Sequence, residues 1–195
     1  MKYKKTNFLK AIVAILLLTI GFSLQSCNSE KKGNNEEEVV SAPRQTLFEA
    51  AFTGKLNLIE QHIKAGTDLN QKDDFGSTAL NIAITFGKTE IAKALIEGGA
   101  DLSVTTADGS TPLHSAAFFG RTEIVRALLE NGVDINTRNS YGSTALESAQ
   151  APFEQVKPIY DQMKRELAPL GLKLDYVEIE KARKEIVALI TNYQG

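Results

Sequence analysis

A 33-residue spacing recurs through the middle of this 195-residue chain and constrains its fold more than any other feature. Glycines, threonines, leucines, alanines and aspartates each return at that spacing. The series are Gly76, Gly109 and Gly142; Thr78, Thr111 and Thr144; Leu47, Leu80, Leu113 and Leu146; Ala50, Ala83, Ala116 and Ala149; and Asp68, Asp101 and Asp134. So many series in one register indicate a solenoid of stacked units, because such folds repeat every ~20–50 residues.

Each unit has the pattern of two short helices. In the third unit Thr111 suits the N-cap of a helix, and Pro112 suits the first helical position, where its missing N–H is not needed. Apolar residues between 124 and 129 recur at helical spacing and predict a second helix. Gly120 and Gly132 end the two helices, since glycine accepts the left-handed conformation found there. One such pair cannot bury its own apolar face, so stacking must stabilise the fold.

Residues 109–117 read Gly-Ser-Thr-Pro-Leu-His-Ser-Ala-Ala. This stretch resembles the mark of the ankyrin repeat, Gly-x-Thr-Pro-Leu-His-x-Ala-Ala. The second unit is similar over residues 78–81, the first lacks the Thr-Pro pair, and the fourth departs from the pattern after Ala149. We therefore expect an all-α fold, a short ankyrin-repeat solenoid of about four helix-pair repeats with a helical insertion in the last repeat.

The predicted ankyrin-repeat domain covers residues 44–195, with repeats at about 44–70, 71–103, 104–136 and 137–195 and the insertion at about 153–176. We expect a helix from about Phe153 to Leu167, a turn marked by Pro169 and Gly171, and a final helix from about Tyr176 to Thr191. Residues 183–190 resemble 121–129 with one residue removed, which indicates the displaced second helix of the fourth repeat. The alternative is a simple C-terminal extension.

The N-terminus has the character of an export signal. Basic residues precede a largely apolar run over residues 11–24, which at 14 residues is shorter than the ~20 that a membrane-spanning helix needs. A short uncleaved anchor helix is the alternative. The run ends in Leu24-Gln25-Ser26-Cys27, which resembles the lipobox of bacterial lipoproteins.

That resemblance implies a signal peptide over residues 1–26 and a diacylglyceryl group on the sulfur of Cys27, with more than one acyl chain as stable anchoring requires. A signal that merely ends near a cysteine is the alternative. Residues 27–43 are polar, cannot bury a core and are predicted to form a flexible tether. Asn28, in place of Asp, favours the outer membrane. We therefore expect a bacterial envelope protein that faces the periplasm or the cell surface.

Charge and residue usage argue against several classes of function. After residue 26 the chain carries 18 basic and 24 acidic residues, a net charge of −6, which disfavours nucleic acid as a partner. The two histidines occupy repeat positions: His114 is expected to hydrogen-bond the turn, and His62 to pack in a second helix. No phosphate loop, metal-spaced cluster or nucleophile with a base stands out. We expect no enzyme activity, no cofactor and no metal.

Partner binding is the function that the family resemblance implies. Ankyrin repeats contact partners through the tips of their finger-like turns and the exposed ends of their first helices. The corresponding candidates are Phe52, Asp74, Phe75, Phe86, Phe118, Phe119 and Tyr141. Aromatic side chains are enriched at binding hot spots. The alternative is that the phenylalanines pack against neighbouring repeats or under the insertion.

We therefore expect a monomeric, lipid-anchored adaptor that binds one or more proteins at the extracytoplasmic face of the envelope. An inhibitory, immunity-like role is the sharper form of this hypothesis. A structural scaffold that maintains the envelope is the alternative, and a hydrolase is the least favoured.

Overall fold

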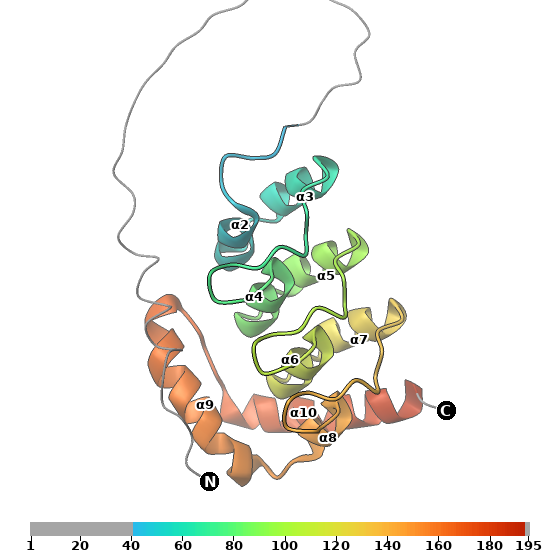
Figure 1. The fold of residues 1–195 in the computed structure, drawn as a ribbon. Coiled ribbons are helices and arrows are strands. Elements are labelled where there is room, and N and C mark those ends of the chain that lie inside the picture. Colours follow the sequence, from blue (N-terminus) through green and yellow to red (C-terminus); the bar gives the residue numbers. More distant parts are fainter. Residues whose placement is uncertain (1–40, 194–195) are drawn as a thin grey trace, which may run out of the picture.

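The computed structural model describes residues 41–193 as a column of helix pairs (Figure 1). These residues contain helices and no strand, which confirms the predicted all-α solenoid. The predicted signal peptide, Cys27 and most of the predicted tether lie outside the described residues. Within residues 41–193, no helix combines the length and the apolar character needed to cross a bilayer.

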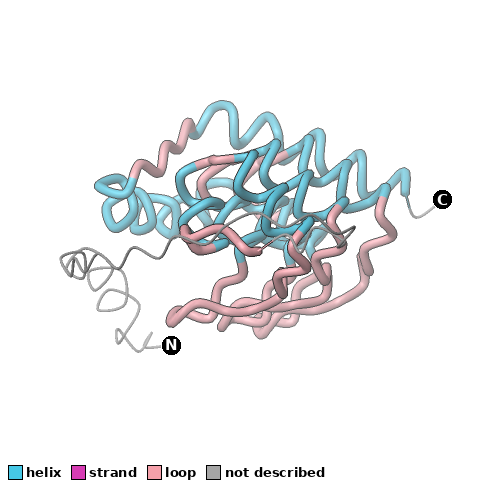
Figure 2. The backbone as a smooth tube through the Cα atoms, turned by 90° about the horizontal axis from the view of Figure 1, so that it is seen from above, coloured by secondary structure: helices cyan, strands magenta, loops and turns pink. Residues whose placement is uncertain are grey.

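The helices follow the repeat. Their bounds are α2 (Leu47–Thr53), α3 (Leu56–Lys64), α4 (Ala79–Thr85), α5 (Thr89–Glu97), α6 (Pro112–Phe118), α7 (Thr122–Glu130), α8 (Ala145–Gln150), α9 (Phe153–Leu167), the 3-10 helix η2 (Ala168–Leu170) and α10 (Tyr176–Tyr193). The first helices of the units, α2, α4, α6 and α8, form one layer, and α3, α5, α7 and α10 form the other. Seen down the column, the loops between units gather along one side and the helices along the other (Figure 2).

Threonine caps begin the first helix of every unit. The side chain of Thr111 accepts a hydrogen bond from the backbone N–H of His114, and Pro112 follows at the first helical position, as predicted. Thr144 and Glu147 form the predicted capping box. In the first unit, which lacks the Thr-Pro pair, Thr46 and Glu49 form a capping box as well. The Thr-x-x-Glu spacing that announces this cap is present in the sequence.

Small and large apolar residues alternate through the core. The repeated leucines Leu80 and Leu113 and the repeated alanines Ala83 and Ala116 are fully buried between the layers. Alanine lets the first helices of adjacent units approach closely, while leucine fills the space between the layers. One core therefore runs the length of the column.

The insertion separates α8 from α10. α10 packs against α7 and α8, just as α7 packs against α5 and α6. It approaches the third unit closely: a Cβ atom added to Gly120, whose φ is 66°, would lie 3.1 Å from the Cβ of Ala182 and 3.2 Å from the Cα of Ile179. α9 stands beside the column, rising from the level of α8 past that of α6 (Figure 1). It runs over the same residues as the predicted helix.

Candidate functional site

Three equivalent turns project from the column between its units. In each, one backbone N–H donates to the carbonyl four residues later, at 2.9 Å from Asp73 to Ser77 and at 3.0 Å from Asn139 to Ser143. The Asp73 carboxylate also accepts the N–H groups of Phe75 and Ser77 at 2.9 and 2.8 Å. These bonds hold the turns rigid, so the side chains at their ends are presented in fixed positions.

The ends of these turns, called here the finger tips, are residues 74–75, 107–108 and 140–141. Tyr141 is the most exposed aromatic residue among those that the structure describes, at 68%. Asp74 is exposed and Phe75 is half-buried. The backbone N–H of Ser140 donates to the carbonyl of Asp108 at 2.9 Å, which ties the second tip to the third. The second and third tips are therefore joined, and the first and third tips each carry an aromatic residue.

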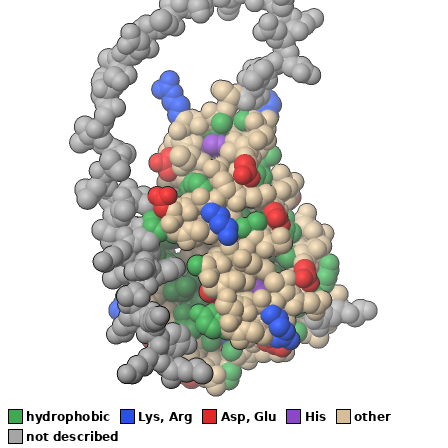
Figure 3. All heavy atoms as spheres, viewed as in Figure 1, with side chains coloured by type: hydrophobic (Ala, Val, Ile, Leu, Met, Phe, Trp, Pro, Cys, Tyr) green, Lys and Arg blue, Asp and Glu red, His purple; other side chains and the backbone are tan. Residues whose placement is uncertain are grey.

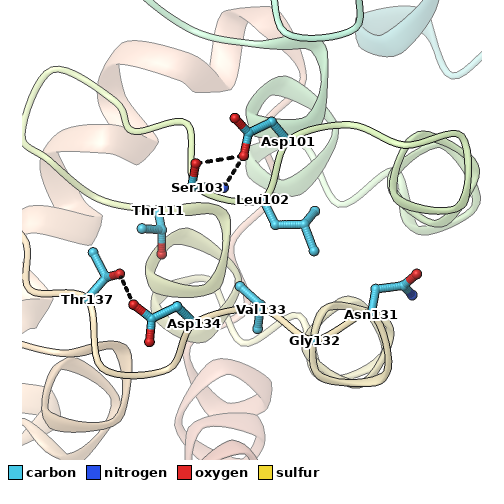
Figure 4. A pocket seen from close by; sticks show the side chains of 9 residues that line it. All are labelled: Asp101, Leu102, Ser103, Thr111, Asn131, Gly132, Val133, Asp134 and Thr137. Atoms are coloured by element: carbon cyan, nitrogen blue, oxygen red, sulfur yellow. Dashed lines mark hydrogen bonds between the residues drawn. The ribbon is translucent and has the colours of Figure 1, made fainter.

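A shallow cavity of about 280 Å³ lies behind the turns, between the second and third units (Figure 4). It has two carboxylates, and neither is free. Asp101 accepts bonds from the hydroxyl and the N–H of Ser103 at 2.6 and 2.8 Å, which hold its pKa below the ordinary value. Asp134 accepts from the N–H of Asn136 and the hydroxyl of Thr137, and its pKa is lowered in the same way. The described residues include no group of three or more His, Cys, Asp or Glu side chains placed to hold a metal ion.

Aromatic residues gather at the C-terminal ends of α2, α4 and α6. This set, the aromatic edge, consists of Phe52, Phe86, Phe118 and Phe119. The rings of Phe52 and Phe86 meet edge to face with centroids 4.8 Å apart. Those of Phe118 and Phe119 meet in the same way at 5.2 Å. The edge thus consists of two aromatic pairs, one on the first two units and one on the third.

The insertion covers Phe118 of the second pair. Tyr160 of α9 is fully buried, and its ring stacks on that of Phe118 with centroids 4.4 Å apart. Its hydroxyl donates to the carbonyl oxygen of Phe118. Phe153 and Tyr176 extend the cluster, at 5.6 and 6.2 Å from the Tyr160 ring. α9 is therefore held to the column by aromatic side chains.

The carbonyl that Tyr160 binds belongs to a repeated position. Thr85, Phe118 and Ala151 are spaced by 33 residues, each at or just after the end of a first helix. Arg121 donates to the carbonyl oxygen of Thr85 at 3.1 Å, and Arg183 donates to that of Ala151 at 2.7 Å. The end of a helix leaves carbonyls unpaired. At each of these three positions, a side chain from later in the chain supplies the missing donor.

Comparison with known families gives the repeat its identity. Residues 47–139 match the family model for ankyrin repeats, in three copies. Residues 47–139 are ankyrin repeats. A search of curated proteins found no match for the chain. Ankyrin repeats form protein-interaction modules and are generally non-catalytic binding scaffolds.

The two histidines have structural roles in the ankyrin repeats. The Nε2 of His114 lies 2.9 Å from the carbonyl oxygen of Ser143, so this histidine ties the third unit to the turn of the fourth. His62 is buried, and its two ring nitrogens lie 3.1 Å from the Thr67 hydroxyl and 2.9 Å from the Gln45 carbonyl. Both rings are committed to internal hydrogen bonds.

The predicted binding residues separate into three groups. Asp74, Phe75 and Tyr141 lie on the finger tips, where ankyrin repeats are expected to meet partners. Phe52 and Phe86 form a half-buried pair, and Phe118 is half-buried under Tyr160. Phe119 is the third group: its side chain is 4% exposed and belongs to the hydrophobic core, as in the alternative that the phenylalanines pack internally.

Two residues that hold the site together, Tyr160 and Arg183, were not predicted from the sequence. Tyr160 belongs to an apolar stripe on α9 at helical spacing, which was a visible signal for its burial. Arg183 aligns with Arg121 when the final helix is matched to the second helix of the third repeat. That alignment alone could have indicated its role as a helix cap.

Proposed function

We propose that this chain is a lipid-anchored adaptor or inhibitor that binds a protein at the extracytoplasmic face of a bacterial envelope. The observation that carries the proposal is the row of rigid finger tips with the exposed ring of Tyr141 at one end. An exposed aromatic side chain on a pre-ordered turn loses little conformational freedom on binding, which favours it as an interface anchor.

The proposed anchor rests on the sequence around Cys27, and the proposed location is the outer membrane, facing the periplasm or the cell surface. A lipid on Cys27 and a tether over residues 27–43 would keep the repeats within a few tens of ångströms of the bilayer, since about 16 flexible residues span roughly 20–25 Å. Cys27→Ser should move the protein from the membrane to the soluble fraction of the envelope. Membrane attachment that survives this change contradicts the anchor.

Partner binding is tested by affinity capture from crosslinked envelopes followed by mass spectrometry. The variant Asp74→Ala, Phe75→Ala, Tyr141→Ala should lose the partner while its helical content stays unchanged. Val177→Ala is the matched control, because Val177 is equally accessible but lies on α10, away from the finger tips. Equal capture by the wild type and the triple variant would exclude the finger tips as the interface.

Two outcomes of the capture separate the alternatives. An inhibitor, including an immunity protein, binds one enzyme tightly and blocks it at equal stoichiometry. A scaffold that maintains the envelope recovers several envelope proteins and blocks none. We propose a monomer in both cases, which sedimentation of the detergent-solubilised chain checks.

A further inference from the structure

One repeat position of the finger tips is held by Phe75, Asp108 and Tyr141, which follow one another at 33-residue spacing. The turns that carry them share the same backbone hydrogen bond, which in the middle turn runs from the N–H of Thr106 to the carbonyl of Ser110 at 3.0 Å. Equivalent side chains therefore lie at equivalent points of successive turns. The position is aromatic on the first and third tips and acidic on the second.

The segments that connect the units also touch one another. Lys72 in the first segment donates from its Nζ to the carbonyl oxygen of Thr105 in the second at 2.7 Å. A Cβ atom added to Gly109 of the second turn would lie 2.9 Å from the Oγ of Ser140 in the third. The first helices that follow these turns pack on one another, and packed helices lie ~8–10 Å apart. We therefore expect side chains at one repeat position to recur at about that spacing along the tips.

The connecting segments, residues 65–78, 98–111 and 131–144, are acidic. They contain one lysine, one arginine and six aspartates: Asp68, Asp73, Asp74, Asp101, Asp108 and Asp134. Within the described part of the chain, none of these aspartates forms an ion pair. The loop side of the column faces the viewer in Figure 3, where acidic side chains recur from level to level.

The cations on this side are too few to offset the aspartates. Lys72 donates to a backbone carbonyl, and Arg138 pairs with Glu147 of α8 at 2.7 Å. The first helices α2, α4, α6 and α8 contain no lysine or arginine. On the second helices, by contrast, Lys93 and Arg126 pair with glutamates of their own helices. The loop side therefore keeps a net negative charge, which attracts cationic partners.

Asp108 has room for a further donor. Its Oδ2 atom accepts from the hydroxyl of Ser110 at 3.1 Å, and a carboxylate oxygen accepts about two hydrogen bonds. The backbone bond from Ser140 to Asp108 places the third tip, with the exposed ring of Tyr141, directly beside it. A cationic side chain can pair with a carboxylate and also lie over an aromatic ring.

We propose that the finger tips bind an extended segment of a partner protein in which a basic residue lies between two apolar residues, each three positions away. The basic residue pairs with Asp108, and the apolar ones pack on Phe75 and Tyr141. In polyproline II geometry, residues three apart lie on one face about 9 Å from one another, which matches the spacing of the tips. The charge of the loop side selects a basic segment over an acidic one. This inference rests on the proposed protein-binding function and names the chemistry of the partner.

Selection of randomised short peptides on the full chain purified in detergent tests the proposal. We expect the enriched peptides to carry a lysine or arginine with an apolar residue three positions to each side. Replacing the basic residue by glutamine should weaken binding by about 10-fold, and so should Asp108→Asn in the protein. Glu60→Gln, an exposed position on α3, is the matched control and should leave peptide affinity unchanged. Enriched peptides that are acidic, or that show no charge preference, would overturn the proposal.

Asp108 also accepts hydrogen bonds within its own turn, so two further variants keep the test sharp. Asp74→Lys reverses an exposed charge on the first tip and should weaken the basic peptides by about 10-fold. Tyr141→Ala removes an apolar contact and should have an effect of similar size. Val177→Ala, an exposed change on α10, should have none. Peptide affinity that stays the same in both finger-tip variants contradicts the proposed site.

Other occupants of the finger tips give distinct results. If a second copy of the chain occupies them, sedimentation shows a dimer that Tyr141→Ala dissociates, and the proposal is wrong. If the chain's own Lys31 and Lys32 occupy them, replacing both by alanine raises peptide affinity by about 10-fold or more, and the proposal is again wrong. Envelope capture that depends on the finger tips, together with selection of acidic or uncharged peptides, overturns this inference alone. Basic peptides that bind the finger tips while no envelope protein is captured count against the proposed function instead.

Discussion

The hydroxyl of Tyr160 in the insertion caps the carbonyl of Phe118, as the guanidinium of Arg121 caps the carbonyl of Thr85. The ring of Tyr160 stacks on the Phe118 ring at 4.4 Å, and its hydroxyl donates to the carbonyl at the end of α6. Thirty-three residues after Arg121 the chain has Glu154, and Arg183, which aligns with Arg121 in the displaced helix, donates to Ala151 of its own unit instead. A tyrosine from the inserted helix thus supplies the cap that the repeat pattern no longer provides. The same contact attaches α9 to the column.

Replacing Tyr160 should therefore loosen α9. Tyr160→Phe keeps the stacked ring and loses only the hydrogen bond, at a cost of about 1–3 kcal/mol because the partner carbonyl is left unpaired. Tyr160→Ala also creates a cavity and should cost about 3–5 kcal/mol. Thermal unfolding followed by circular dichroism measures both. Ile159→Ala, on the exposed flank of α9, serves as the control. An equal loss of stability in this variant would show that the contact with Phe118 contributes no more than an exposed side chain does.

Alkaline pH should weaken the same contact. Burial raises the pKa of Tyr160 to about 12, whereas an unfolded tyrosine titrates near 10. Folding favours the neutral hydroxyl, so its contribution is complete below about pH 10 and is lost as the pH rises from about 10 through 12, to a total of about 2–3 kcal/mol. Urea unfolding of the wild type and of Tyr160→Phe at about pH 9 and about pH 11.5 measures this. The difference in unfolding free energy between the two proteins should close at the higher pH. A difference that stays constant would contradict the prediction.

Arg183 should be needed for the junction between α8 and α10. Its side chain is 3% exposed, and its Nη2 donates to the carbonyls of Ser148 and Ala151 at 2.9 and 2.7 Å. Arg183→Met keeps much of the packing but removes both bonds, at a cost of about 1–3 kcal/mol. The rate of backbone amide hydrogen exchange should then rise in α8. Lys184→Ala is the matched control on the exposed side of the same helix. A more stable Arg183→Met protein would mean that the unpaired Nε and Nη1 of Arg183 outweigh the two bonds.

Asn81 offers a way to stabilise the column. It holds the repeat position of His114, yet its buried side-chain amide has no hydrogen-bond partner within the described residues. His114 reaches the carbonyl of Ser143, and the equivalent carbonyl for position 81 is that of Ser110. Asn81→His should form this bond and raise stability by about 1 kcal/mol. His114→Asn should lower it by about 1–3 kcal/mol. A lower melting temperature for Asn81→His would show that the second unit lacks room for the ring.

The parts of the fold that local chemistry controls were predictable. Thr111 with Pro112 and Thr144 with Glu147 begin helices where the sequence predicts them, because N-caps act within one turn. The finger tips were also predictable, since each turn repeats at a fixed spacing. The burial of Phe119 was not predictable from the sequence. Phe119 holds the same repeat position as the half-buried Phe86, so the position within the repeat does not by itself decide burial.

By itself, then, the sequence determined the repeat, its helices and its turns, because these depend on spacing, caps and glycines that act over a few residues. The tertiary structure decided how the aromatic edge is divided. Tyr160 lies 42 residues after Phe118, and Arg183 lies 32 residues after Ala151. Contacts at such separations depend on the path of the whole insertion, which no local pattern specifies. That path places Tyr160 on Phe118, whereas Phe52 and Phe86 contact one another.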